Sequence, residues 1–252
     1  MLEITLEHVT KTYGKTKAMD DVSFKLQEGH SIGLVGESGC GKSTTASVIA
    51  GLVRPNAGQC MFGGKEISHL KGQDFLDYRR NVQMVFQDPS SALNPRLTAR
   101  QCVAEPIRNF LQLSKIEENE RINMLLEQVG LTPDDADKYP RAFSGGQRQR
   151  ICIARAIALN PHFLLLDEVT SSLDVSVQAQ IINLLGDLRK IHNMGILMIS
   201  HDIGVVRYVC DKVLVMYRGN IVEELDSEKF SEAQHPYSKK LLASVPAIFS
   251  AP

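Results

Sequence analysis

The chain has 252 residues, of which 43% are hydrophobic and 23% are charged. This composition is ordinary for a soluble globular protein, and the length fits one large α/β domain or a core with an inserted subdomain. Lysine and arginine number 28 against 29 aspartate and glutamate residues, so no positive excess is available to bind nucleic acid by counterion release. We therefore expect no nucleic-acid partner.

Neither a membrane span nor a secretory signal is expected. Apolar runs such as residues 151–159 and 195–199 are far shorter than the ~20 residues that a membrane span needs. The start, MLEITLEHV, lacks the basic residues and the long apolar stretch of a secretory signal, so we expect a cytoplasmic chain. The cysteines are widely spaced without a CxxC pair, which favours buried thiols over metal sites or disulfides: Cys40, Cys60, Cys102, Cys152 and Cys210.

The predicted elements begin with two segments of alternating polarity. We expect two strands of an antiparallel edge sheet at LEITLEHVTKTY and VSFKLQEG. A short apolar strand follows at SIGLVG and leads through a glycine-rich turn into the helix TTASVIAGL, which ends at Gly51. Further apolar strands are expected at NVQMVFQD, HFLLLDE and GILMISHD. Such strands, each followed by helix or loop, predict a mostly parallel sheet covered on both faces.

The middle of the chain has helical periodicity instead. It is clearest in AEPIRNFLQL and RINMLLEQVGL, where Gly130 and Pro133 stop the second helix. This pattern predicts an α-helical subdomain, about 88–150, inserted in the α/β core. Near the C-terminus, Arg218-Gly219-Asn220 predicts a hairpin turn, after which we expect the sheet to end and a short tail with HPYSKKLLASVP to follow.

A phosphate-binding loop is the strongest chemical signal. Residues 36–43 read GESGCGKS, a full match to G-x-x-x-x-G-K-[ST]. In such a loop backbone N–H groups cradle phosphates, Lys42 reaches the β- and γ-phosphates, and the Ser43 hydroxyl ligates Mg²⁺. A chance match is expected in roughly one chain in a hundred of this length, but the strand before and the helix after favour function. The predicted nucleotide-binding residues are Gly36, Glu37, Ser38, Gly39, Cys40, Gly41, Lys42, Ser43 and Thr44.

Two acidic residues end the strand HFLLLDE. Asp167 can hold the Mg²⁺ that bridges the phosphates, and Glu168 can polarise an attacking water. An apolar strand followed by Asp-Glu is usually only a strand end that meets solvent. It gains weight here because a phosphate-binding loop lies upstream.

A second anion-binding loop is expected at FSGGQRQR, residues 143–150. Ser144 is a good helix N-cap, and Gly145 and Gly146 allow backbone N–H groups to approach a phosphate closely. A helix N-terminus also carries unpaired N–H groups and partial positive charge. The loop therefore predicts an anion-binding site, and its residues alone leave open which anion it holds.

Three further residues are ambiguous when each is taken alone. Gln87 follows the strand MVF and could reach the metal or the attacking water. His201 follows ILMIS and could contact a γ-phosphate, while Tyr13 could stack on an adenine. Singly, each residue is more typical of a surface or packing position.

The order of all these features closely resembles the ATP-binding subunit of ABC (ATP-binding cassette) transporters over nearly the whole chain. The ordered set is Tyr13, GESGCGKS, Gln87, SGGQ, LLLDE, SSLD and His201. The resemblance implies an α/β fold with a P-loop NTPase core, and an ABC nucleotide-binding domain over 1–225 followed by a tail over 226–252. It also implies ATP hydrolysis with ATP and Mg²⁺ as cofactors.

The resemblance further assigns roles to single residues. It implies that Tyr13 is the adenine-stacking aromatic, that Gln87 is the Q-loop glutamine at the metal, and that His201 is the switch histidine. Residues Ser144 to Gln147 would be the ABC signature and Asp174 the D-loop aspartate. In the family the signature contacts an ATP held by a second cassette, so that two cassettes sandwich two nucleotides head to tail.

The partners that the resemblance implies are therefore a second ATPase subunit, either a sister or an identical chain, and two transmembrane permease subunits. A solute-binding protein would act indirectly. The chain would lie peripherally on the cytoplasmic face of the membrane. Docking on the permease is expected through the cleft between Gln87 and the inserted helices, roughly residues 90–113.

Finer resemblance points to the dipeptide, oligopeptide and nickel importer ATPases, a group that includes opine-metallophore importers. It rests on QDPSSALNPR, FSGGQRQR, LDVSVQAQI and HPYSKKLLASVP. Longer peptide-type members often carry a cysteine cluster in the tail, and its absence here favours nickel or a metal chelate as cargo. The family usually has Pro and Ala where this chain has Val169 and Ser172, and valine does not fix φ as proline does.

Other ABC proteins compete with the transport interpretation. ATPases of DNA repair or chromosome organisation carry long coiled coils between the motifs, but no heptad pattern is sustained here. A translation-associated protein would have two cassettes in one chain, whereas this chain has one P-loop and one SGGQ. A non-catalytic cassette would have lost a key residue, and Lys42, Glu168 and His201 are all present.

Overall fold

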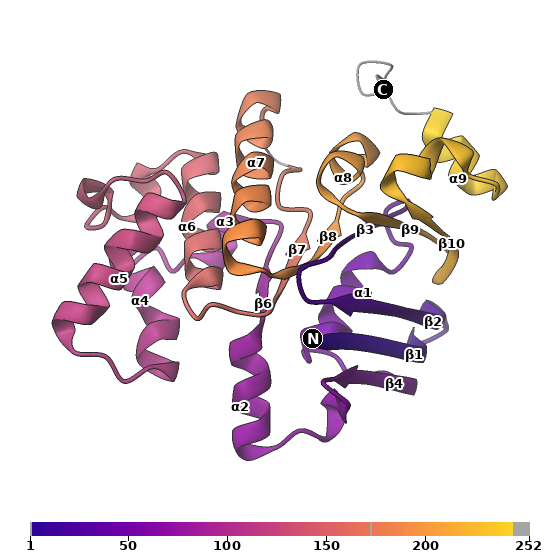
Figure 1. Ribbon diagram of the computed structural model, residues 1–252, viewed down its shortest axis with the longest axis horizontal. Coiled ribbons are helices and arrows are strands. Elements are labelled where there is room, and N and C mark those ends of the chain that lie inside the picture. Colours follow the sequence, from indigo (N-terminus) through magenta and orange to yellow (C-terminus); the bar gives the residue numbers. More distant parts are fainter. Residues whose placement is uncertain (1, 172, 244–252) are drawn as a thin grey trace.

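The structure is a computed structural model that describes residues 2–171 and 173–243. Its larger sheet consists of strands β3 (Ser31–Val35), β6 (Val82–Val85), β7 (Phe163–Asp167), β8 (Gly195–Ile199), β9 (Lys212–Tyr217) and β10 (Asn220–Asp226). Their order across the sheet is β10-β9-β3-β8-β7-β6, and every neighbouring pair except β10–β9 is parallel (Figure 1). The prediction of a mostly parallel sheet is confirmed.

Both faces of this sheet are covered, as the apolar strands predict. Alternate residues of a strand point to opposite faces, and in β7 Leu164 and Leu166 join one core while Phe163 and Leu165 join the other. The first core contains residues of helices α6 (Gly145–Ile157), α7 (Val175–His192) and α8 (Ile203–Val209). The second contains residues of helix α1 (Lys42–Ile49) and of the smaller sheet.

The smaller sheet is antiparallel and has the order β2-β1-β4-β5. Its strands are β1 (Glu3–Tyr13), β2 (Thr16–Gln27), β4 (Ala57–Phe62) and β5 (Lys65–Glu66). The predicted pair β1–β2 is confirmed, with Ile4 opposite Leu26. The sequence analysis missed β4 and β5, because AGQCMFGGKE has few β-branched residues and is interrupted by glycines.

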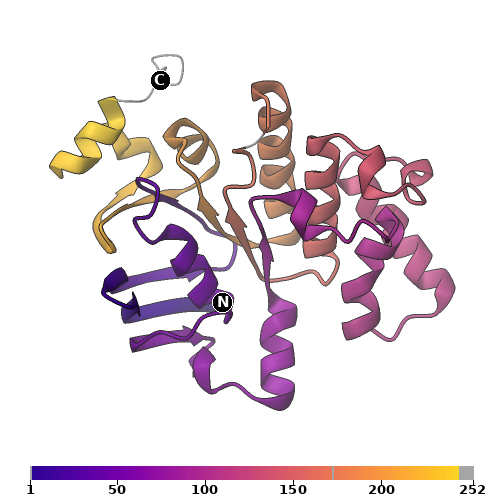
Figure 2. The same ribbon diagram turned by 180° about the vertical axis from the view of Figure 1, so that it is seen from behind.

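A helical part follows strand β6 and groups at one end of the molecule, away from the smaller sheet (Figures 1 and 2). It contains α3 (Pro89–Ala92), α4 (Ala99–Phe110), α5 (Lys115–Gln128) and α6, whereas helix α2 (Gly72–Asn81) precedes β6. The two predicted helices are confirmed as α4 and α5. Thr98 and Ser114 cap them through capping boxes with Gln101 and Glu117. The domain limits 1–225 and 88–150 stay a prediction.

The C-terminal part corrects one expectation. The hairpin turn at Arg218-Gly219 is present, but the expectation that the sheet ends there is wrong: β10 pairs with β9 from Asn220 opposite Tyr217 to Asp226 opposite Lys212. Strand β10 was missed because NIVEELD carries three acidic residues, a composition typical of an edge strand. A 3₁₀ turn (Ser227–Glu232) and helix α9 (Pro236–Ala243) follow. The end of HPYSKKLLASVP lies outside the described residues.

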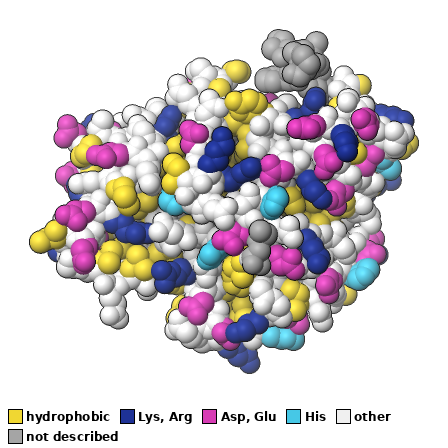
Figure 3. Space-filling view, viewed as in Figure 1, with side chains coloured by type: hydrophobic (Ala, Val, Ile, Leu, Met, Phe, Trp, Pro, Cys, Tyr) yellow, Lys and Arg dark blue, Asp and Glu magenta, His cyan; other side chains and the backbone are white. Residues whose placement is uncertain are grey.

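Among the helices of the described ranges, none has both the length and the apolar character needed to traverse a bilayer. All five cysteines are buried thiols, as the sequence predicts. Burial raises the pKa of Cys152 to about 11. On the face shown in Figure 3, basic and acidic side chains are interspersed.

Candidate nucleotide-binding site

The loop between β3 and α1 has a backbone course that requires glycine, as expected of a loop that can cradle a phosphate. Gly41 has φ of 114°, and a Cβ added there would lie 1.9 Å from the carbonyl oxygen of Ala18. Only glycine fits such a close approach in this backbone conformation. The chain therefore turns sharply into α1, with Gly41 directly before its first residue, Lys42.

Lys42 places a buried cation at this loop. Its side chain is 4% exposed, and its Nζ donates to the carbonyl oxygens of Gly36 and Glu37 at 2.8 and 2.9 Å. Within the described part of the chain, no carboxylate forms an ion pair with Lys42. A buried charge that is held only by neutral acceptors favours an anionic ligand.

Ser43 and Asp167 form the second component of the candidate nucleotide-binding site. The Ser43 hydroxyl donates to Asp167 Oδ1 at 3.0 Å, which joins residues 124 positions apart. Burial raises the pKa of the Asp167 carboxyl above its ordinary value, and the Ser43 hydrogen bond opposes that rise. Hydroxyl and carboxylate oxygens are ligands that Mg²⁺ accepts, so this pair fits a magnesium ion beside the loop.

Glu168 is the meeting point of three strand ends. Gln87, after β6, donates its Nε2–H to Glu168 Oε2 at 3.0 Å, and His201 Nδ1, after β8, lies 3.8 Å from the same oxygen. Parallel strands present their carboxyl ends at one edge, where open α/β sheets bind ligands. The structure therefore gathers Gln87, Glu168 and His201 at the edge that also carries Asp167 and the P-loop.

The backbone at Glu168 is unusual. Its φ is 49°, a left-handed value that costs ~1–3 kcal/mol for a residue with a side chain and is typical of functional sites. The Glu168 N–H donates to Ile199 O at 3.0 Å, and the Ser171 N–H and hydroxyl both donate to Glu168 O. Val169 is 3% exposed in the core. These hydrogen bonds hold the turn at residues 168–171 in place, although Val169 stands where the family usually has proline. Ser172 lies outside the described residues.

Ser144 of the SGGQ loop is the N-cap of helix α6, as predicted. The Ser144 Oγ accepts the Gln147 N–H at 3.3 Å, and Gln147 Oε1 accepts the Ser144 N–H at 3.0 Å. A Cβ on Gly146 would lie 2.4 Å from Val177 Cγ1. Close packing against the first turn of α7 is thus a reason for glycine at 146, in addition to the phosphate approach expected from the sequence.

The two predicted anion-binding loops do not bond to each other within the chain. Among the described residues, no hydrogen bond or ion pair joins 36–44 to 144–147. Helix α6 stands with α4 and α5, apart from α1, in both views (Figures 1 and 2). The two loops for which the sequence predicts anion binding are therefore separate within one molecule.

A scan against protein-family models matches residues 19–171 to the model described as ABC transporter. The chain belongs to the ABC transporter family. It is 48% identical over 235 residues to the oligopeptide transport ATP-binding protein AppF of Bacillus subtilis, covering 92% of this chain and 71% of that protein. It is 44% identical to the oligopeptide transport ATP-binding protein OppF of the same organism, and the match covers 95% of this chain and 80% of OppF. The glutathione import ATP-binding protein GsiA of Pectobacterium atrosepticum is 46% identical, and the match covers 96% of this chain and 38% of GsiA.

Solved ABC structures are similar in fold. The dimeric post-hydrolysis structure of the ATP-binding cassette MJ0796, bound to ADP and Pi, has a TM-score of 0.80 and 31% identity, covering 89% of this chain and 98% of that one. CbiO1 from Clostridium perfringens has a TM-score of 0.82 and 27% identity, covering 98% and 97%. The predicted fold and family are confirmed, and the chain is an ABC-type ATPase that binds ATP.

The remaining predicted residues of this ABC protein lie on the surface. Tyr13, at the end of β1, is 51% exposed, and the Lys11 ammonium lies over its ring, 5.2 Å from the ring centre. Asp174 caps α7 by accepting the Val177 N–H at 3.0 Å. Hydrogen bonds from Ser176 and Val177 hold the pKa of Asp174 below its ordinary value. Their roles in ATP hydrolysis stay predictions.

The sequence analysis missed two contacts of this ABC site. Ser171 Oγ lies 3.4 Å from Gln87 Nε2, and the hydroxyl of Tyr237, in the tail, accepts the N–H of Glu37 in the P-loop at 2.8 Å. Ser171 lies in SSLD and Tyr237 lies in HPYSKKLLASVP, but nothing in these segments indicates contacts with residues 84 and 200 positions away.

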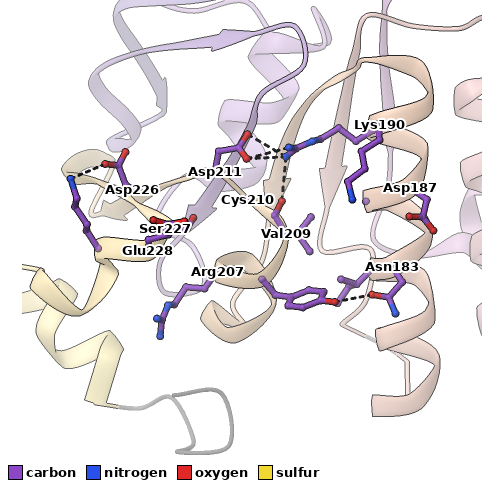
Figure 4. A pocket seen from close by; sticks show the side chains of 15 residues that line it. Asn183, Asp187, Lys190, Arg207, Val209, Cys210, Asp211, Asp226, Ser227 and Glu228 are labelled. Atoms are coloured by element: carbon purple, nitrogen blue, oxygen red, sulfur yellow. Dashed lines mark hydrogen bonds and ion pairs between the residues drawn. The ribbon is translucent and has the colours of Figure 1, made fainter. Parts of the chain in front are cut away.

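A cavity of about 990 Å³ lies elsewhere in the ABC fold, between α7, α8 and the 3₁₀ turn (Figure 4). Within it Arg189 pairs with Asp211 at 3.2 Å and the Tyr208 hydroxyl donates to Asn183 at 3.4 Å. None of the predicted site residues lines the described part of this cavity. The nucleotide site is therefore assigned from the P-loop and the strand ends.

Proposed function

We propose that this chain is the ATP-hydrolysing subunit of a membrane importer for small peptides. The observation that carries the catalytic part is the convergence of Gln87 and His201 on Glu168, beside the Ser43–Asp167 pair. The cargo rests on similarity, since the relatives named above are an oligopeptide transport and a glutathione import protein. These names support a peptide over the nickel or metal-chelate cargo that the sequence favours.

The residues of the site divide the work of hydrolysis. The N–H groups of the P-loop and the Lys42 ammonium bind the phosphates of ATP. Ser43 and Asp167 would hold Mg²⁺, which would supply positive charge to neutralise those phosphates. Glu168 takes the proton of the attacking water. Gln87 orients Glu168 through its hydrogen bond. His201 lies 3.8 Å from the same carboxylate, and we assign it to the γ-phosphate of a bound ATP.

The second anion-binding loop acts on another chain. The N-terminus of α6 offers N–H groups and partial positive charge to a γ-phosphate, but it does not contact its own P-loop. We assign it to the ATP of a second cassette, either a sister or an identical chain, arranged head to tail. The dimeric structure of MJ0796 supports this assembly.

A groove beside Gln87 suits the permease. It has a volume of about 310 Å³ and lies between the end of β6 and helix α4, where Phe86, Glu105, Pro106 and Phe110 line it. Phe86 is 44% exposed. The groove adjoins the residue that senses the hydrolytic site, so a permease segment bound there would respond to ATP at the cytoplasmic face of the membrane.

Transport by the reconstituted complex tests the proposal. This chain, its two permease subunits and a sister ATPase are placed in proteoliposomes with the solute-binding protein, and ATP-dependent accumulation of labelled oligopeptide and of labelled nickel is measured. Peptide accumulation that stops with Glu168→Gln supports the proposal. Accumulation of nickel without peptide overturns the cargo, and no ATP-dependent uptake of either overturns the importer.

A further inference from the structure

The C-terminal tail is fastened to the sheet before it reaches the P-loop. The N–H groups of Gln234 and His235 donate to the Glu223 carboxylate of β10, with the Gln234 contact at 2.6 Å. Phe230, in the preceding 3₁₀ turn, is fully buried. Helix α9 therefore starts at a fixed place over β9 and β10, as Figure 1 shows.

Tyr237, in the first turn of α9, reaches the P-loop from this position. It is 7% exposed, its ring centre lies 4.3 Å from that of Tyr217 at the end of β9, and its hydroxyl accepts the Glu37 N–H at 2.8 Å. Burial raises the pKa of Tyr237, so the hydroxyl stays neutral at ordinary pH. The contact is a part-buried hydrogen bond between the tail and a backbone group of the P-loop.

Glu37 is consequently held at both of its backbone polar groups. Its N–H is bound by Tyr237, and its carbonyl oxygen accepts a hydrogen bond from Lys42 Nζ at 2.9 Å. The side chain adds little, because the Lys240–Glu37 pair at 3.8 Å joins two exposed groups. A shift of the Glu37 backbone would therefore move an acceptor of the buried Lys42 ammonium.

We propose that Tyr237 is a positioning residue for ATP binding: through its hydroxyl, helix α9 fixes the Glu37 backbone and with it the place of Lys42. The tail is thus part of the nucleotide site, although it contains none of the motifs that identify that site. The inference rests on ATP binding by this chain and is independent of its cargo.

The Tyr237→Phe variant tests this inference, because it removes the hydroxyl and keeps the ring. ATP hydrolysis by the full chain is measured over a range of ATP concentrations. We expect KM for ATP to rise about three- to tenfold, the scale of one hydrogen bond, while kcat changes by less than about twofold. The Glu37 amide should also exchange its hydrogen faster than in the wild type.

Tyr217→Phe is the matched control, because no described residue hydrogen-bonds to the Tyr217 hydroxyl and its ring packs on the same partner. It should leave KM and Glu37 exchange unchanged, as should Lys240→Ala. An unchanged KM in Tyr237→Phe overturns the inference while hydrolysis itself stands. So does an equal effect of Tyr217→Phe, or exchange that rises over all of β10 and α9, because these results indicate only a loosened tail.

Discussion

The carboxyl edge of the large sheet and the N-terminus of α6 are the two predicted phosphate-binding regions, and they differ in how many predicted site residues each brings together. At the edge, Gln87, Glu168 and His201 converge beside Lys42 and the Ser43–Asp167 pair. The Ser144 loop satisfies its own cap and reaches none of them. The difference fits the proposal that the sheet edge acts on the chain's own ATP, while the Ser144 loop acts on the ATP of a second cassette.

The largest effect on ATP hydrolysis is expected from a substitution at the carboxyl edge of the large sheet, called the edge site below. Glu168→Gln should retain ATP binding while hydrolysis falls by ~10²–10⁴-fold, because an amide cannot take a proton from water. Binding is measured with a fluorescent ATP analogue and turnover by phosphate release. Turnover at the wild-type rate would remove Glu168 from this role. Glu105→Gln, on α4, is a control of the same chemistry and should hydrolyse ATP normally.

The next effect tests the loop that acts outside its own chain. Ser144→Arg should lower hydrolysis by ~10²–10³-fold, the scale of losing one preorganised donor. Ser114→Arg is the matched control, since Ser114 caps α5 with the same capping box as Ser144 and the same 3.3 Å contact. It should cost only about 1 kcal/mol of stability and leave hydrolysis intact.

Mixing decides whether the loop acts in trans. Lys42→Ala disables the P-loop of its own chain, so Ser144→Arg and Lys42→Ala chains together contain one intact site only if the loop serves its partner. ATP-driven formation of mixed dimers, detected by crosslinking, and recovery of hydrolysis are both expected. Mixed chains that neither close on ATP nor hydrolyse it contradict the trans assignment and return the loop to an ordinary helix cap.

A smaller effect concerns the support of Glu168. Gln87→Ala removes the donor at 3.0 Å, and the carboxylate should lose orientation, so that kcat falls about tenfold, in line with one hydrogen bond to a charged group. Gln83→Ala is the control, because Gln83 lies on β6, the strand that precedes Gln87, and its amide donates to Arg79 O instead. Equal kinetics of the two variants would contradict the positioning role.

The smallest effect on the isolated chain is expected in the groove beside the edge site. Phe110→Asp should change free ATP hydrolysis by less than about twofold, because Phe110 lies outside the catalytic contacts. In the reconstituted complex it should abolish stimulation of hydrolysis by the permease, since a charge would enter an apolar contact. Met124→Asp is the control, because Met124 is a 47% exposed apolar residue on α5 outside the groove. Full stimulation in Phe110→Asp would place the permease elsewhere.

The sequence determined the features whose physics is local. Four residues suffice to cap α6 at Ser144, and eight consecutive residues define a loop that needs glycine at 41 before the lysine at 42. Runs of apolar residues likewise indicated β3, β7 and β8, because strands buried on both faces of a parallel sheet show little alternation. Each of these patterns lies within a single helix, strand or loop, so it can be interpreted without knowing which other elements pack against it.

The tertiary structure decided which of these features meet. Gln87 and Glu168 lie 81 positions apart and Glu37 and Tyr237 lie 200 apart, and no local pattern encodes either contact. Strand β10 also depends on its partner, because its acidic residues favour a strand only when β9 supplies the backbone hydrogen bonds. The physical reason is that strand order and packing set these distances, and both are fixed by the cores that the whole chain builds.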